Sequence, residues 1–112
     1  MTAAVRVLVV DDHSVLRSGL RLMLEQQPDL AFVGEAATAE EALRCVDQAA
    51  PDVVMLDLQM PGMGGLEGAV RLKQRQPDLR ILVLSMHDEA DDIRRAFAAG
   101  ADGYLVKTAA DE

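Results

Sequence analysis

The chain has 112 residues, half of which are hydrophobic, and it carries a formal net charge of -8 and one cysteine. This length supports one domain with a modest core, and the acidic balance argues against direct nucleic-acid binding by this segment, because phosphate binding needs a basic face. The lone Cys45 excludes a disulfide framework and no apolar stretch approaches the ~20 residues of a membrane span, so we expect a cytoplasmic domain without membrane contact.

The first strand and helix are predicted over residues 5–26. An apolar run over residues 5–10 predicts the strand, and Asp11 and Asp12 follow it directly. Apolar residues at helical spacing then predict a helix from residue 14, which ends before Pro28 because proline cannot continue a helix.

A second strand and helix are predicted over residues 30–49. The apolar run at residues 30–36 indicates the strand. Thr38 and Glu41 form a capping-box pattern, in which the two side chains satisfy backbone N–H groups at the start of a helix. The helix that follows repeats small and branched apolar residues along one side.

The third predicted strand leads into one carboxylate. An unbroken apolar run over residues 53–56 precedes Asp57, and the turn at residues 60–62 follows it. Such a run is typical of a strand buried on both faces. Asp57 is therefore expected at the carboxyl end of that strand, the edge where open parallel sheets bind their ligands. Apolar spacing over residues 66–72 predicts the next helix.

The last third of the chain repeats the same alternation. A strand over residues 81–84 precedes Ser85, and a helix is marked by apolar residues around 93–97. A fifth strand over residues 104–106 precedes Lys107. Each helix provides a crossover between strands that run in one direction. The fold class is therefore α/β, a doubly wound five-stranded parallel sheet covered on both faces.

Only five residues follow Lys107 in this chain. Residues 108–112 are expected to be the first turn of a fifth helix, the rest of which is missing. Such a helix would cover part of the sheet next to the first helix. We therefore expect a fragment of a longer protein that self-associates through the uncovered face, with a homodimer as one outcome.

Polar residues follow four of the predicted strands, and a parallel sheet brings these strand ends to one edge. They are Asp11, Asp12, Asp57, Ser85 and Lys107. Three carboxylates gathered there repel one another, and a hard oxygen set favours Mg²⁺ over zinc. With the ammonium and the hydroxyl, the set is typical of phosphoryl transfer. Taken singly, each residue has a structural explanation: helix cap, turn residue or solvated lysine.

Four segments carry a resemblance to a known family: V-V-D-D-H at 9–13, L-D-L-Q-M-P-G-M at 56–63, L-S-M-H at 84–87 and G-A-D-G-Y-L-V-K at 100–107. On these segments the chain resembles the receiver domain of bacterial two-component response regulators over essentially its whole length. The D-D-H and S-M-H-D wording is most similar to the subfamily that usually carries a C-terminal LuxR-type helix-turn-helix domain. The resemblance implies a flavodoxin-like sheet of strand order 2-1-3-4-5, with the fifth helix missing.

The resemblance also implies the roles of the strand-end residues. Asp57 would accept a phosphoryl group from a phosphohistidine on a partner histidine kinase. Asp12, Asp57 and the backbone carbonyl of Gln59 would bind Mg²⁺, or Mn²⁺ in its place, with Asp11 helping through a water molecule. Lys107 would contact a phosphoryl oxygen.

Further residues are implied to transmit or tune the signal. Ser85 would move toward the phosphoryl group and Tyr104 would turn inward into the vacated space, a packing switch driven by a local charge. The Met60-Pro61 pair would shape the loop after the acceptor. Gln59 and His87 would influence the lifetime of the acyl phosphate, although a solvated loop position explains His87 equally well.

Several positions depart from the common receiver pattern. Gly64 and Thr108 stand where many receivers have aspartate and proline, respectively. Met86 is bulkier than the residue usually found there and is expected to narrow access to Asp57. His13 is expected near the start of the first helix rather than as a metal ligand.

The resulting hypothesis is a phosphorylation-controlled signalling switch, which is not an enzyme but takes part in its own phosphorylation and slow dephosphorylation. In the full-length protein it would control a DNA-binding, transcription-regulating output domain that lies outside this chain. A haloacid-type phosphatase would need a second acid where Gln59 stands. An interaction module that no longer takes phosphate would usually lack one of the acidic residues or Lys107. An FMN-binding flavodoxin would need a phosphate loop where the sequence has D-D-H.

Overall fold

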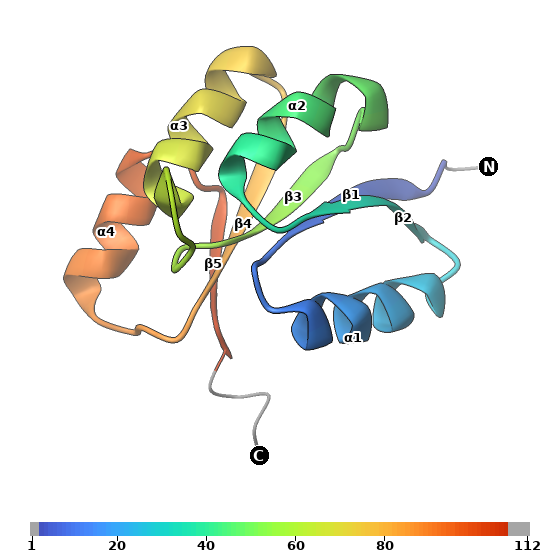
Figure 1. Cartoon of the computed structure of the whole chain (residues 1–112), viewed down its shortest axis with the longest axis horizontal. Coiled ribbons are helices and arrows are strands. Elements are labelled where there is room, and N and C mark those ends of the chain that lie inside the picture. Colours follow the sequence, from blue (N-terminus) through green and yellow to red (C-terminus); the bar gives the residue numbers. More distant parts are fainter. Residues whose placement is uncertain (1–2, 108–112) are drawn as a thin grey trace.

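The computed structural model describes residues 3–107 and has five strands and four helices in strict alternation (Figure 1). The strands are β1 (Val5–Val10), β2 (Leu30–Ala36), β3 (Val53–Asp57), β4 (Arg80–Ser85) and β5 (Gly103–Val106). The helices are α1 (Ser14–Glu25), α2 (Ala39–Ala49), α3 (Gly64–Arg75) and α4 (Ala90–Ala98). All pairings are parallel, in the order β2-β1-β3-β4-β5, so the predicted fold class and strand order are confirmed. Thr108 and the expected start of a fifth helix lie outside the described residues.

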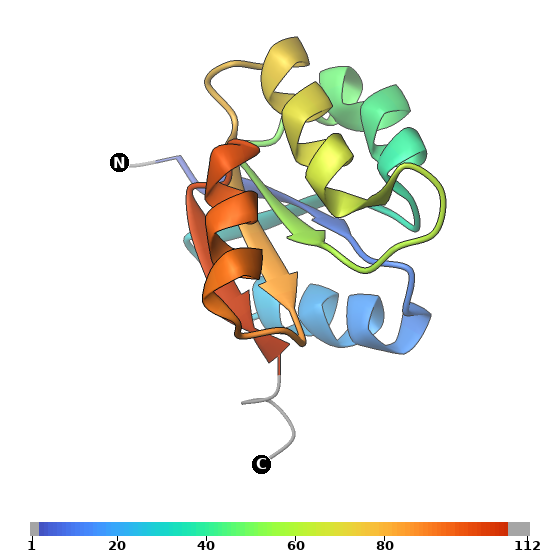
Figure 2. The ribbon, with the colours of Figure 1, turned by 90° about the vertical axis from the view of Figure 1, so that its left-hand side faces the viewer.

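The helices cover the two faces of the sheet unequally (Figures 1 and 2). Helices α2, α3 and α4 pack over the larger apolar cluster, which contains Leu8, Val54, Leu56 and Ile81. Helix α1 alone covers the smaller cluster on the opposite face. Successive β1 residues serve the two clusters in turn, because side chains along a strand alternate between faces.

The central strands β1, β3 and β4 are buried on the face that α2, α3 and α4 cover. Leu8, Val54, Leu56, Ile81 and Val83 are fully inaccessible to solvent. On the opposite face Val9 of β1 is also fully buried, whereas Met55 of β3 is only partly buried. The predicted burial on both faces is therefore confirmed for β1 and only in part for β3. This core holds the carboxyl ends of these strands in fixed relative positions.

The capping box that the sequence predicts at the start of α2 is present. The Glu41 backbone N–H donates to Thr38 Oγ1 at 3.1 Å, and the Glu41 side chain accepts from the Ala37 backbone N–H at 3.3 Å. The return bond comes from the residue before the cap, one position earlier than the usual pattern. Within residues 3–107, none of the helices combines the length and the hydrophobicity that a membrane crossing needs.

Candidate functional site

The sheet brings the predicted polar residues to one edge. Asp57 is the last residue of β3 and Ser85 is the last residue of β4, while Asp11 and Lys107 directly follow β1 and β5. The Lys107 Nζ lies 3.1 Å from Asp11 Oδ2 and 3.2 Å from Asp57 Oδ1. Residues 96 positions apart are therefore in direct contact, as the parallel topology predicts.

The two carboxylate oxygens of Asp57 differ: Oδ1 has polar partners, and Oδ2 has none among the described residues. Its side chain is fully buried, and Oδ1 accepts a hydrogen bond from the Gln59 backbone N–H at 3.1 Å besides facing Lys107. Its Oδ2 is buried without a hydrogen-bond partner among the described residues. A buried carboxylate oxygen without a partner is costly in a purely structural role, so it indicates a site for a ligand or a reaction.

The surroundings of Asp57 raise the pKa of its carboxyl group. Burial raises the pKa of its carboxyl group, and the nearby charge of Asp11 raises it further. The hydrogen bond from Gln59 and the charge of Lys107 lower this pKa but do not cancel the increase. The site therefore holds more negative charge than its single lysine neutralises.

An acidic group forms beside Asp57. One donor atom each of Asp11, Asp12, His13 and Asp57 lie within 4.8 Å of one another. The His13 Nδ1 is 3.1 Å from Asp11 Oδ1 and 3.2 Å from Asp12 Oδ1. His13 is the residue immediately before α1, as expected, but its ring also joins the acidic group, which was not predicted. The sequence feature that could have predicted this contact is the position of His13 directly after Asp11 and Asp12.

The donor set fits a divalent cation. Three carboxylates converge with one ammonium group, and the unpartnered Asp57 Oδ2 is a buried acceptor that a cation would satisfy. Carboxylate oxygens are hard ligands of the kind that Mg²⁺ and Mn²⁺ accept. The predicted contribution of the Gln59 backbone carbonyl stays a prediction.

The predicted switch residues are linked through the backbone of residue 87. The buried Ser85 Oγ donates to Gln59 Oε1 at 3.3 Å and accepts from the His87 backbone N–H at 3.0 Å. The Tyr104 hydroxyl donates to the His87 carbonyl oxygen at 2.7 Å. Ser85 therefore binds the backbone N–H of His87 and Tyr104 binds its carbonyl oxygen, in the loop between β4 and α4.

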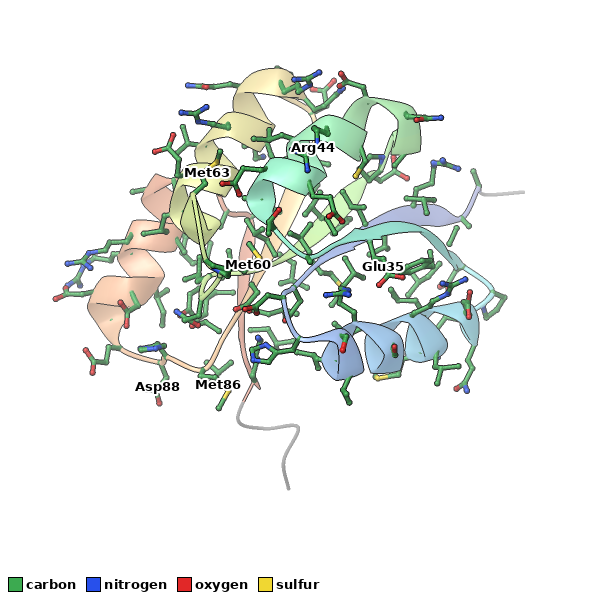
Figure 3. The ribbon with its side chains drawn as sticks, in the orientation of Figure 1. Glu35, Arg44, Met60, Met63, Met86 and Asp88 are labelled. Carbon is green, nitrogen blue, oxygen red and sulfur yellow. The ribbon has the colours of Figure 1, made fainter. Side chains whose placement is uncertain are left out.

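Two side chains in that loop, His87 and Met86, are not buried at the strand ends. The ring of His87 faces α4, with its Nδ1 3.6 Å from Asp92 Oδ2, so its effect on an acyl phosphate stays a prediction. Met86 is about half exposed, in the loop segment that also carries Asp88 (Figure 3). Its predicted narrowing of the access to Asp57 also stays a prediction.

Glu40 holds the loop between β3 and α3, a role that the sequence analysis missed. Its Oε2 accepts the Met63 backbone N–H at 3.2 Å. Gly62 has a φ of 79°, and a Cβ atom there would lie 2.7 Å from the same oxygen. The loop, which carries the labelled Met60 and Met63 in Figure 3, therefore requires both the glycine and the carboxylate.

Comparisons with known proteins agree on one family. The family described as Response regulator receiver domain matches residues 7–112. The nitrate/nitrite response regulator protein NarL of Escherichia coli (strain K12) is 40% identical over 101 residues, which cover 90% of this chain and 47% of NarL. The response regulator GacA of Pseudomonas aeruginosa is 41% identical over 105 residues, covering 94% of this chain and 49% of GacA. The chain thus spans about half the length of the curated relatives it matches.

Solved structures give the same result. A LuxR-family two-component response regulator from Aurantimonas sp. SI85-9A1 superposes with a TM-score of 0.89 and 40% identity, covering 95% of this chain and 76% of that one. The signal receiver domain of NarL from Mycobacterium tuberculosis superposes with a TM-score of 0.88 and 37% identity, covering 95% and 86% of the two chains.

Proposed function

Because this chain belongs to the response regulator receiver domain family, and so to two-component signalling, we propose that Asp57 is the residue that accepts the phosphoryl group. The observation that carries the proposal is the buried, unpartnered Asp57 Oδ2 beside Lys107 and the acidic group. A carboxylate oxygen without a hydrogen bond keeps its lone pairs available, either for a cation or for attack on phosphorus. A receiver domain is a signalling domain, so the chain acts as a switch rather than as an enzyme that turns over a substrate.

The proposed reaction is a transfer between side chains. An Asp57 carboxylate oxygen attacks the phosphorus of a phosphohistidine on a partner histidine kinase. The new phosphorus–oxygen bond forms as the phosphorus–nitrogen bond breaks, and the imidazole of the kinase leaves with the electron pair and is then protonated. The product is an acyl phosphate on Asp57. Lys107 contacts a phosphoryl oxygen and neutralises part of its charge.

A bound Mg²⁺, or Mn²⁺ in its place, supplies the remaining neutralisation of the phosphoryl oxygens. In this proposal Asp12, Asp57 and the Gln59 backbone carbonyl hold the ion directly, and Asp11 acts through a water molecule. The support in this chain is the convergence of three carboxylates with only one ammonium group. Because the site is otherwise too acidic, phosphorylation is expected to require the cation.

Phosphorylation is then proposed to rearrange the loop between β4 and α4. For Ser85 to reach the phosphoryl group, its hydroxyl must leave Gln59 Oε1. Since the Ser85 hydroxyl also accepts from the His87 N–H, this movement pulls on the residue whose carbonyl holds Tyr104. Tyr104 would turn inward in response, and Gln59 and His87 would set how long the acyl phosphate survives.

The output of the switch is proposed from the relatives. The transcriptional regulatory protein LiaR of Bacillus subtilis is 39% identical to this chain over 104 residues, which cover 49% of LiaR. We infer that the full-length protein has an output domain that binds DNA and regulates transcription. Self-association of the 112-residue chain stays a prediction, which light scattering at high concentration would contradict by showing only monomer.

The experiment that tests the proposed function is intact-mass spectrometry after incubation with acetyl phosphate and Mg²⁺. Wild type should gain one phosphoryl group, and Asp57→Asn, or wild type with the Mg²⁺ chelated, should gain none. If folded wild type gains nothing from acetyl phosphate or from a phosphorylated histidine kinase, the proposal is wrong. The phosphate-independent interaction module would then be the better explanation.

A further inference from the structure

The ring of His13 contacts the acidic group and does not cap α1. His13 precedes α1, but its side chain makes no capping hydrogen bond to the helix. The partners found for its ring within residues 3–107 are the carboxylates of Asp11 and Asp12. The ring is therefore held at the acidic group rather than at the helix terminus.

The backbone fixes this placement. The His13 N–H donates to Asp11 Oδ1 at 2.8 Å, so the residue is bound to the acidic group at two points. Because a carboxylate only accepts hydrogen bonds, Nδ1 carries the ring hydrogen in this contact and donates it to Asp11 Oδ1. The side chain is 66% exposed, so a cation that enters between these groups can leave the ring hydrogen on Nε2 in water, and Nδ1 is then a ligand nitrogen.

The spacing of the donor atoms matches a coordination sphere. Neighbouring ligands of an octahedral ion with bonds of about 2.1 Å are about 3.0 Å apart. The Nδ1 of His13 lies 3.1 Å and 3.2 Å from one oxygen each of Asp11 and Asp12. Asp57 adds a donor within 4.8 Å of the others, and its fully buried Oδ2 has no other partner among the described residues.

We propose that His13 is a direct ligand for a borderline divalent cation of the first transition series, and that it makes this site prefer such an ion over Mg²⁺. The proposal rests on the proposed function, because it assumes that the carboxylates around Asp57 bind a cation. Imidazole nitrogen favours ions such as Ni²⁺ and Zn²⁺, whereas Mg²⁺ takes oxygen ligands and keeps several waters. Mg²⁺ therefore binds without His13, and the softer ion binds with it.

The test is calorimetric titration of the untagged 112-residue chain with Ni²⁺ and, separately, with Mg²⁺. His13→Gln keeps a polar side chain but removes the imidazole. We expect it to weaken Ni²⁺ binding about tenfold or more and to change Mg²⁺ binding by less than about twofold. His87→Gln is the matched control, because it removes the other histidine of the chain, whose ring faces Asp92, and should leave the Ni²⁺ affinity near that of wild type.

Pulsed electron paramagnetic resonance of the Cu²⁺-loaded protein gives a direct readout, because Cu²⁺ is a paramagnetic ion that favours imidazole ligands. Wild type should show the hyperfine coupling of a bound imidazole nitrogen, and His13→Gln should lose it. Equal Ni²⁺ affinities for wild type and His13→Gln, or no nitrogen coupling in wild type, would overturn the His13 assignment. Asp57→Asn separates the two proposals: if it leaves Mg²⁺ binding unchanged, the proposed cation site itself is wrong, whatever His13 does.

Discussion

At the scale of single residues, the site gathers more negative than positive charge around the buried carboxylate of Asp57. Asp11 and Asp57 are both fully buried, and Lys107 contacts both. Breaking such a buried network by removing one partner is costly, whereas replacing a charge with a neutral residue of the same shape can stabilise the fold. Stability and function are therefore expected to oppose each other at this site.

Asp57→Asn should be more stable than wild type at neutral pH in metal-free buffer. Burial raises the pKa of Asp57, so the folded state binds a proton at a pH where the unfolded chain has already released it. Stability therefore falls as the pH rises from about 3.9 through the raised pKa, and asparagine avoids this loss. We expect a gain in stability at pH ~7 that shrinks toward pH ~4.

Urea unfolding of both proteins across this pH range measures the effect. A difference between them that grows as the pH falls would have the wrong sign for a carboxyl group with a raised pKa.

Lys107→Gln should bind Mg²⁺ more tightly and accept phosphoryl groups more slowly. Removing the ammonium group leaves Asp11 and Asp57 without their positive neighbour, so a bound cation no longer faces a like charge and should gain at least ~tenfold in affinity. The phosphoryl group loses the same positive charge. Calorimetry and the acetyl phosphate assay measure the two effects.

Lys73→Gln is the control for Lys107→Gln, because Lys73 is the only other lysine in the sequence and pairs with Asp102. It should alter neither quantity. Weaker Mg²⁺ binding by Lys107→Gln would show that the ammonium group organises the carboxylates rather than competing with the cation.

The residues that the sequence could predict are those at strand ends. Asp57, Ser85 and Lys107 each follow an apolar run, and parallel topology alone places such residues together. Glu40 and Arg17 could not be found in this way. Glu40 contacts a loop 23 positions away, and Arg17 bonds to the Asp11 carbonyl and to Glu35. These contacts join polar side chains of helices to a loop, a strand end or a neighbouring strand, and no periodicity encodes such pairings.

At the scale of elements, periodicity predicted which segments are helices better than where they begin. Apolar spacing marks the last two helices only from residues 66 and 93, but α3 begins at Gly64 and α4 at Ala90. The first turn of α4 contains Asp91 and Asp92, which favour a helix N-terminus electrostatically but belong to no apolar stripe. Terminal turns are therefore set by charge and backbone geometry rather than by burial.

Two glycines inside helices should respond to alanine with opposite signs. A Cβ atom added at Gly19 of α1 meets nothing within 4 Å, so Gly19→Ala should stabilise the fold by about 0.5 to 1 kcal/mol through helix propensity. At Gly68 of α3 a Cβ atom would lie 2.8 Å from the Cβ of Ala39 at the start of α2. Gly68→Ala should therefore destabilise the fold by about 1 to 3 kcal/mol.

Denaturant unfolding of the two variants compares them directly, since each substitution adds one methyl group to a helix. A gain in stability at Gly68 would mean that α2 and α3 separate without cost.

At the scale of the whole molecule, the buried core supports the proposed switch residues, which lie together at one edge of the sheet. The radius of gyration of 13.1 Å is close to the value of about 13 Å expected for a compact domain of this size. Every element of the proposed switch contacts the loop between β4 and α4 or the strand ends beside it. We therefore expect a charge added at Asp57 to act first on α4 and β5, which lie together at one side of the sheet (Figure 2).

The central claim is that the phosphoryl group is carried by Asp57 and not by the neighbouring Asp11 or Asp12. Borohydride reduces an acyl phosphate of aspartate to homoserine, so reduction after treatment with acetyl phosphate and Mg²⁺ marks the acceptor permanently. Peptide mass spectrometry then locates the mark. The account predicts homoserine at position 57 alone. Homoserine at position 11 or 12, or phosphorylated protein with an unchanged Asp57, would contradict it.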